Sequence, residues 1–160
     1  MMKQCCHISM IYCSWALYLG GLVLLSWREQ FAFAAAWLIA GPLLQWLYIL
    51  EFPRISRFLG YGPVSDEASD VAGRSSAKVT LYTALGCPFC PILEQRLKTL
   101  QKQLGFILET IDVTLRPDLV ASKGIRSVPV VQAGGRSLIG LVTTKQLAEA
   151  IGPVQRFAGN

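Results

Sequence analysis

Two long apolar stretches dominate the first third of the chain. No charged residue occurs in residues 8–26 or in residues 31–50, and each stretch approaches the ~20 residues that cross a bilayer as a helix. Only a Trp-Arg-Glu-Gln turn separates them. A signal peptide fits less well, because its apolar core is only ~7–15 residues long and no small-x-small cleavage site follows. The pattern predicts a transmembrane helical hairpin over residues 8–51.

Basic residues flank this hairpin more on one side than on the other. Lys3 precedes the first stretch, Arg54 and Arg57 follow the second, and Arg74 and Lys78 come further along. The turn holds a single Arg accompanied by a Glu. Because the cytoplasmic flanks of membrane helices carry the excess of Lys and Arg, the pattern predicts an integral membrane protein with both termini in the cytoplasm.

The segment after the hairpin, residues 52–77, has two parts. Residues 52–59 mix aromatic side chains with arginines, a composition that favours lying in the lipid headgroup layer. Residues 60–77 contain Gly, Ser and Asp without periodicity, which predicts a flexible linker with an r.m.s. reach of roughly 23 Å. We therefore expect a tethered domain that turns toward the membrane or away from it.

A different pattern fills residues 78–157, where short apolar runs alternate with amphipathic ones. One helix face is marked by leucines at helical spacing, namely Leu93, Leu97, Leu100 and Leu104. A capping box from Thr143 to Gln146 opens a later helix. The predicted order is strand, helix, strand, helix, strand, strand, helix, at residues 78–83, 88–104, 106–113, 117–123, 128–131, 137–139 and 143–151. This order predicts an α/β domain whose first two strands are parallel and joined by a helical crossover.

The strongest chemical signal is the Cys87-Pro88-Phe89-Cys90 motif between the first strand and the first helix of this domain. We expect Cys87 at the helix N-cap and Pro88 at the first helical position, where a missing N–H costs nothing. The free N–H groups and the dipole of the helix then stabilise a thiolate on Cys87, the form that attacks disulfides. Cys87 is the predicted nucleophile, and Cys90, one turn deeper and more buried, is the predicted resolving thiol.

Two other interpretations of the cysteine pair are weaker. Zinc usually takes four ligands, and residues 28–160 contain no further cysteine and no histidine. Further ligands would have to come from a second subunit or from the tail at residues 1–7, which contains Cys5, Cys6 and His7. The adjacent cysteines of this tail are more often free thiols than a metal site or an accessory dithiol. A structural disulfide across so short a loop would stabilise little.

The net charge of +5 changes the picture little. Part of this charge comes from the basic residues that flank the hairpin, which would lie near anionic headgroups. The basic residues of the domain are scattered among acidic ones. Because no basic stripe with interleaved aromatics occurs, nucleic-acid binding is not predicted.

The domain resembles the thioredoxin superfamily over its full length. Residues 81–90, Leu-Tyr-Thr-Ala-Leu-Gly-Cys-Pro-Phe-Cys, are similar to a glutaredoxin active-site strand and loop, whereas residues 124–129, Gly-Ile-Arg-Ser-Val-Pro, look more like thioredoxin. The resemblance implies a thioredoxin-like fold, with a central four-stranded mixed sheet flanked by helices and a cis Val128–Pro129 bond against the nucleophilic sulfur. It also implies that an extended substrate pairs with the backbone of Val128 like an added strand. The implied substrate-binding residues are Pro88, Phe89, Val128 and Pro129.

The sequence departs from both families of this superfamily at characteristic positions. Glutaredoxins usually have Lys at the position of Ala84 and Asp after a Gly pair near residues 141–143, and both help to bind glutathione carboxylates. Thioredoxins have a buried Asp at the position of Leu81 and a Trp at that of Gly86. We therefore expect a dithiol protein as the reductant, with glutathione possible but disfavoured. No cofactor is expected beyond a Cys87–Cys90 disulfide.

Together these features predict a membrane-anchored thiol-disulfide oxidoreductase that acts on disulfides or thiols of membrane-associated proteins. The alternative is a non-catalytic accessory subunit of a larger membrane complex, with the domain as a docking module. Small residues four apart favour helix association in lipid, and they occur at Ala16, Gly20, Ala32, Ala36 and Ala40. The intact cysteine pair favours the enzyme.

Overall fold

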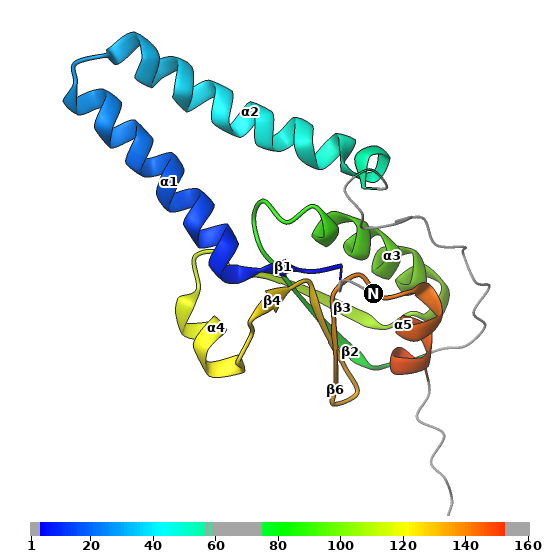
Figure 1. Ribbon diagram of the computed structural model, residues 1–160. Coiled ribbons are helices and arrows are strands. Elements are labelled where there is room, and N and C mark those ends of the chain that lie inside the picture. Colours follow the sequence, from blue (N-terminus) through cyan, green and yellow to red (C-terminus); the bar gives the residue numbers. More distant parts are fainter. Residues whose placement is uncertain (1–3, 57, 59–74, 153–160) are drawn as a thin grey trace, which may run out of the picture.

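The computed structural model describes residues 4–56, 58 and 75–152. Within them, two long helices, α1 (Ile8–Trp27) and α2 (Phe31–Ile55), form a hairpin that projects from an α/β domain (Figure 1). The domain consists of β2 (Lys78–Thr83), α3 (Phe89–Leu104), β3 (Ile107–Asp112), α4 (Pro117–Lys123), β4 (Ser127–Val128), β5 (Val130–Ala133), β6 (Arg136–Ile139) and α5 (Thr144–Ile151). The predicted order of elements is confirmed except that the strand predicted at residues 128–131 is divided at Pro129 into β4 and β5. Residues 153–157 lie outside the described part.

The domain is built on a four-stranded mixed sheet of order β3-β2-β5-β6. β2 pairs in parallel with β3, from Lys78 opposite Ile107 to Thr83 opposite Asp112. On its other side β2 pairs antiparallel with β5, and β5 pairs antiparallel with β6 across a turn at Gly134 and Gly135. The mixed sheet and the parallel pairing of its first two strands are therefore confirmed.

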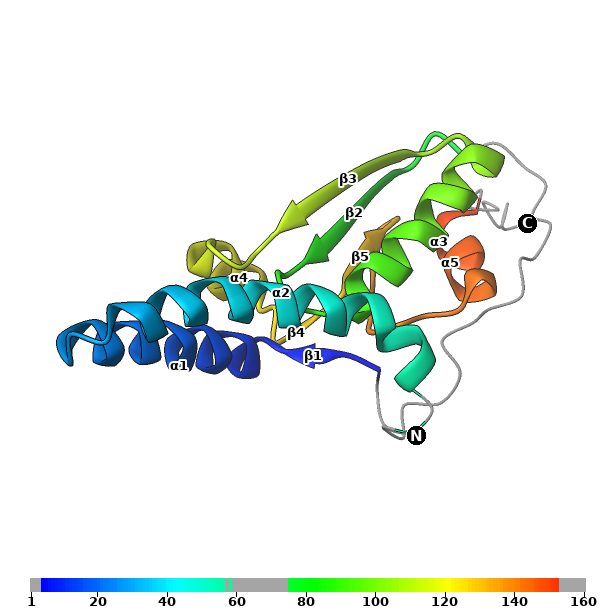
Figure 2. The same cartoon turned by 90° about the horizontal axis from the view of Figure 1, so that it is seen from above.

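Helices α3 and α5 pack against each other on one face of the sheet (Figure 2). The predicted leucine face of α3 is buried there, in a core of Val79, Leu81, Leu93, Leu97, Leu100, Leu104, Phe106, Val131, Leu147 and Ile151. Thr143 and Gln146 form the predicted capping box at the start of α5. Gly105 ends α3 with a φ of 75°, a left-handed conformation that glycine adopts without steric cost.

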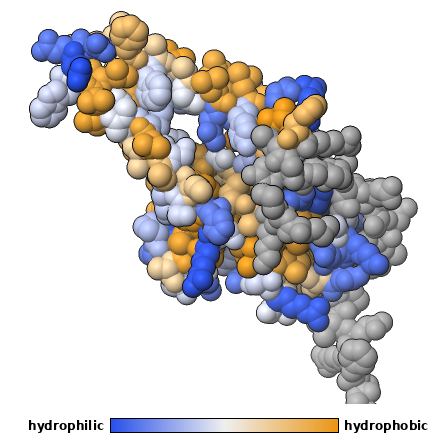
Figure 3. Space-filling model, in the orientation of Figure 1, coloured by the Kyte–Doolittle hydropathy of each residue, from blue (hydrophilic) through white to orange (hydrophobic). Residues whose placement is uncertain are grey.

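The hairpin exposes apolar side chains along most of its length (Figure 3), and both helices are long and apolar enough to cross a membrane. An aromatic side chain of each helix packs closely against a glycine of the other helix. A Cβ on Gly41 would collide with the ring of Tyr18, and one on Gly21 would lie 3.4 Å from the ring of Trp37. These contacts differ from the predicted small-residue ridges, because a Cβ on Gly20 would meet nothing within 4 Å.

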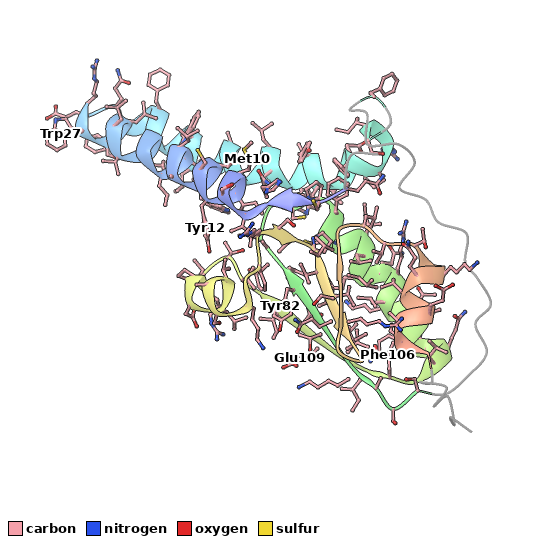
Figure 4. All side chains as sticks on the ribbon, turned by 60° about the horizontal axis from the view of Figure 1, so that its bottom comes forward. Met10, Tyr12, Trp27, Tyr82, Phe106 and Glu109 are labelled. Carbon is pink, nitrogen blue, oxygen red and sulfur yellow. The ribbon has the colours of Figure 1, made fainter. Side chains whose placement is uncertain are left out.

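The base of the hairpin is part of the core of the domain, an arrangement that the sequence pattern does not predict. Residues before α1 form a short strand, β1 (Cys6–His7), which pairs antiparallel with β4. Ile8 at the start of α1 and Phe52 near the end of α2 are buried in a second core cluster that contains the cysteine loop. Tyr12 points from α1 toward the domain and donates a hydrogen bond to the Val113 carbonyl at 3.4 Å (Figure 4).

Two expectations for residues 52–77 are wrong where the structure describes them. α2 runs on through Pro53 to Ile55, and Phe52, expected in the headgroup layer, is 0% exposed because the domain covers it. The end of the predicted linker belongs to the domain, since the Ser75 N–H donates to the Leu104 carbonyl at 2.8 Å. Residues 59–74, most of the predicted linker, lie outside the described part. The domain rests against the hairpin here, because both bury apolar surface in that contact.

Candidate active site

The cysteine loop follows the central strand β2 and leads into α3. The loop turns at Gly86, whose φ is 90°. The Cys90 N–H then donates to the Cys87 carbonyl at 3.3 Å. α3 begins at Phe89 with Pro88 as its N-cap, so the prediction of Cys87 as N-cap is wrong by one residue. Helix starts shift this much because their first turn is often irregular.

The sulfur of Cys87 is surrounded by hydrogen-bond donors. The thiol of Cys6, then that of Cys90, and the N–H groups of Phe89 and Cys90 hydrogen-bond to it and lower the pKa of Cys87, against the opposing effect of burial. Hydrogen bonds to the charged form, and N–H groups at the start of a helix, favour the thiolate. The lowered pKa has the direction that the sequence predicts for a nucleophile.

Cys6 and Cys90 shift in the opposite direction. Hydrogen bonds to Cys87, followed by burial, raise the pKa of each of these two thiols. A thiolate on Cys87 therefore opposes ionisation of the other two thiols, since a second ionisation would place like charges side by side. The protonated Cys87 thiol donates a hydrogen bond to the Val128 carbonyl, 3.8 Å away. This hydrogen bond is lost when Cys87 ionises.

Both cysteines of the motif are buried. The exposed fraction is 2% for Cys87 and 4% for Cys90, so the expectation that Cys90 is the more buried of the two is wrong. Both cysteines are covered by the N-terminal part of the chain, because β1 lies beside β4 and the end of α2 lies against the cysteine loop. The site is closed in this structure.

The peptide bond between Val128 and Pro129 is cis, as the resemblance implies. Both residues are buried. The backbone of Val128, expected to pair with an extended substrate, pairs with Cys6 of β1. The N-terminal strand of the chain therefore occupies the edge predicted for substrate.

The last turns of α2 cover the cysteine loop. The ring of Phe52 meets that of Phe89 edge-on with centroids 4.9 Å apart. Nearer the middle of α2, the side-chain amide of Gln45 donates to the Gly86 carbonyl at 3.2 Å. Pro88 and Phe89, expected to bind substrate, are consequently buried beneath the hairpin.

Gln45 and Phe52 were not predicted at this site, and Cys6 was considered only as part of a disfavoured metal site or accessory dithiol. Gln45 carried a usable signal, because it is the only amide in the apolar stretch at residues 31–50 and a polar group there requires a partner. The sequence around Phe52 and Cys6 carried no comparable signal, since each contacts a segment distant in the chain.

The cluster of sulfurs is not a metal site in the part of the chain that the structure describes. No group of three or more His, Cys, Asp or Glu side chains in these residues is arranged to hold a metal ion.

The domain is similar to a known protein family and to several solved structures. Residues 78–152 match the family of the glutaredoxin-like domain (DUF836). No curated protein matches the sequence. Among solved structures, a mutant thioredoxin from Halobacterium salinarum NRC-1 is 24% identical, with a TM-score of 0.42, over 53% of this chain and 92% of that one. Oxidised thioredoxin from Plasmodium falciparum is 19% identical, with a TM-score of 0.41, over 47% of this chain and 80% of that one.

A third similar structure is a mutant of the alkylhydroperoxide reductase AhpF from Enterococcus faecalis. It is 20% identical, with a TM-score of 0.48, over 68% of this chain and 52% of that one, so the chain spans about half of that protein. All three TM-scores are below 0.5, and the fold is established instead by the order of the mixed sheet and by the family match. Residues 78–152 therefore form a glutaredoxin-like domain of the thioredoxin superfamily.

Proposed function

We propose that the protein is a thiol-disulfide oxidoreductase whose redox centre is the Cys87 and Cys90 pair. The observation that carries this proposal is the placement of the two cysteines at the start of α3, where the Cys90 N–H donates to the Cys87 carbonyl at 3.3 Å. The thiols of Cys6 and then of Cys90 lower the pKa of Cys87 there, and Cys87 raises that of Cys90. A low-pKa thiol is ionised and attacks a disulfide readily, and it is also a good leaving group when another thiol attacks the sulfur that is bonded to it.

The residues define two exchange steps. The Cys87 thiolate attacks one sulfur of a substrate disulfide, the S–S bond breaks, and the other substrate sulfur leaves as a thiolate. Cys90 then gives up its proton and attacks the Cys87 sulfur, which releases the first substrate sulfur as a second thiolate. Two electrons pass to the substrate, and the cysteine pair ends as a disulfide. The same steps in reverse oxidise a substrate dithiol.

The test is turnover of a peptide disulfide by the full chain in detergent, with dithiothreitol as the electron source. We expect Cys87→Ser to abolish activity, and we expect Cys90→Ser, mixed with the peptide disulfide before dithiothreitol is added, to stop at the mixed disulfide. Cys13→Ser is the matched control, since Cys13 is an exposed cysteine of α1 and its loss should leave the rate unchanged. Full activity in Cys87→Ser would overturn the proposal.

The hairpin is proposed to anchor this activity in a membrane, so that the enzyme acts on thiols or disulfides of membrane-associated proteins. Leu17, Val23 and Leu44 are each at least 60% exposed, and side chains of this kind along two long helices favour lipid as their surroundings. Both termini are proposed to lie in the cytoplasm. An impermeant maleimide applied to intact cells should then label Arg28→Cys at the hairpin turn but not Lys145→Cys on the domain, in a chain lacking other cysteines. The opposite labelling would reverse the orientation.

The contacts between the domain and the hairpin helices determine how close the domain lies to the membrane. They reach Tyr12 in α1 and Gln45 in α2, which leaves residues 13–27 and 31–44 clear of it. At 1.5 Å per residue these segments span about 22 Å, whereas the hydrocarbon core is about 30 Å thick. The docked domain is therefore proposed to sit in the headgroup layer, with the cysteine loop at the membrane surface.

The proposed electron donor is a dithiol protein in preference to glutathione. Ala84 is buried and offers no ammonium group for a glutathione carboxylate. Thr143 offers no carboxylate for its amino group, and its hydroxyl is already engaged in capping α5. A donor protein would be held by pairing of its backbone with a strand edge of the domain, which needs neither an ammonium group nor a carboxylate.

One observation favours a non-catalytic accessory subunit, namely the burial of Cys87 beneath β1 and α2. In that case the closed form would be permanent, and Cys87 would not exchange with any disulfide. The turnover measurement above distinguishes the two, since the enzyme must open and the accessory subunit need not.

A further inference from the structure

The N-terminal strand lies across the active site in the position of a bound peptide. Cys6 is paired with Val128, and His7 with Ser127, in an antiparallel ladder. The pairing continues at both ends, where the Ile8 N–H donates to the Arg126 carbonyl at 3.2 Å and the Gln4 carbonyl accepts the Leu141 N–H at 2.8 Å. Addition of an extended segment to a free strand edge is a common way of binding peptides.

Gly140 makes room for this strand. A Cβ at position 140 would lie 3.0 Å from the Gln4 carbonyl oxygen and 3.5 Å from the Cβ of Cys5. The φ of Gly140 is 89°, a conformation that side chains other than glycine rarely adopt. The N-terminal strand and the domain therefore fit closely at backbone level.

The two tail cysteines have different surroundings. Cys6 packs against the core cluster of the cysteine loop and hydrogen-bonds to the sulfur of Cys87. Successive side chains of a strand point to opposite faces, and Cys5 accordingly lies on the side of Gly140. Adjacent Cα atoms are ~3.8 Å apart, closer than the ~4.4 Å lower limit usual for disulfides. Cys6 is thus better placed to pair with Cys87 than with Cys5.

We propose that Cys6 is a third redox-active cysteine, which exchanges with the Cys87–Cys90 disulfide to form a Cys6–Cys87 disulfide. This inference rests on the proposed redox activity of Cys87. The product is a closed form in which the N-terminal strand is covalently held on the substrate edge. An external thiol or Cys90 reopens it.

The exchange needs no further oxidant. Cys6 loses its proton and its thiolate attacks the sulfur of Cys87; the Cys6–Cys87 bond forms, the Cys87–Cys90 bond breaks, and Cys90 leaves as a thiolate that takes up a proton. One disulfide and one thiol are present before and after, so no electrons are gained or lost overall.

The oxidation state of Cys87 controls when Cys6 is reactive. In the reduced site the hydrogen bond to Cys87 raises the pKa of Cys6 and keeps it protonated. Once Cys87 is in a disulfide it carries no charge, and both that hydrogen bond and the repulsion between the two sulfurs are removed. Cys6 then ionises more readily, at the stage when its target sulfur is available.

The experiment uses the full chain in detergent with Cys13→Ser and Cys90→Ser, treated with dithiobis(nitrobenzoate) in slight excess. Cys87 attacks the reagent and releases one aryl thiolate. Attack by Cys6 on the resulting mixed disulfide releases a second from the same site and leaves a Cys6–Cys87 disulfide, which non-reducing peptide mapping identifies. We expect this product with Cys5→Ser added, and an aryl group retained on Cys87 with Cys6→Ser added.

Retention of the aryl group in both triple variants, or a Cys5–Cys87 disulfide in the Cys6→Ser chain, would overturn the role of Cys6 and leave the proposed function standing. If Cys87 fails to react in every folded variant yet reacts once the chain is unfolded in denaturant, the proposed function fails and this inference fails with it.

Discussion

The ring of Phe52 meets the ring of Phe89 edge-on, with centroids 4.9 Å apart and planes at 85°. Phe89 lies inside the cysteine motif, and Phe52 lies near the end of the second hairpin helix. Both side chains are no more than 2% exposed. The contact therefore joins the hairpin directly to the cysteine motif, and we expect access to Cys87 to depend on whether this contact opens.

We expect Phe52→Ala to open the site. Removing a buried Phe ring costs about 3–5 kcal/mol, and if this weakens docking by about 3 kcal/mol, Cys87 should be alkylated about 100-fold faster at fixed pH. Phe58→Ala is the matched control, because Phe58 is 94% exposed and its loss should change the rate little. Equal rates in both variants would show that α2 does not restrict access.

The pH dependence of Cys87 alkylation tests the electrostatics of the site. Because its pKa is lowered, Cys87 should stay ionised and react at a constant rate through neutral pH, and the rate should fall only when acid protonates the thiolate. Cys6→Ala removes the largest cause of the lowered pKa, so the midpoint should move up toward the free value of ~8.5. Cys5→Ala should leave it in place. An unshifted midpoint in Cys6→Ala would contradict the hydrogen bond.

Gly86 and Gln45 should couple energetically. A Cβ on Gly86 would lie 2.8 Å from the Gln45 amide nitrogen, at a φ of 90°. Gly86→Ala should cost roughly 1–2 kcal/mol from left-handed backbone strain, plus the collision. Gln45→Ala should cost about 0.5–1.5 kcal/mol for its hydrogen bond, but should cost less when Gly86→Ala is already present. Additive losses in denaturant unfolding of the four chains would argue against the contact.

Glutathione should be a poor donor. Each charge-assisted hydrogen bond that Ala84 and Thr143 cannot provide weakens its capture by roughly 1–3 kcal/mol, or about 5- to 150-fold. We expect slow turnover of a glutathione mixed disulfide, and loss of that activity in Cys90→Ser. Efficient turnover that survives Cys90→Ser would indicate a monothiol mechanism with glutathione as the true donor.

The sequence was sufficient for the domain because its signals are local. The leucine spacing of α3, the capping box at Thr143, the Gly-Gly turn and the Cys-Pro-Phe-Cys loop each act over a few residues, and the structure contains each of them. The lowered pKa of Cys87 is local only in part, because its largest cause is the distant Cys6 thiol, followed by the Cys90 thiol and then by the N–H groups at the start of α3.

The closure of the site was not predictable in the same way. It depends on Cys6 meeting Val128 and Phe52 meeting Phe89, pairs that no periodicity connects. The apolar pattern of the hairpin indicates burial in lipid as readily as burial in protein. Only the amide of Gln45 pointed to a protein partner.

The most direct test of the account is the equilibrium between dithiol and disulfide at Cys87 and Cys90. The full chain would be equilibrated in dithiothreitol redox buffers, quenched with acid and mapped by mass spectrometry. The account predicts a reversible two-electron transition, with a tenfold change in the oxidised-to-reduced ratio for about 30 mV, that vanishes in Cys87→Ser. Two free thiols at Cys87 and Cys90 across the whole range of buffers would contradict it.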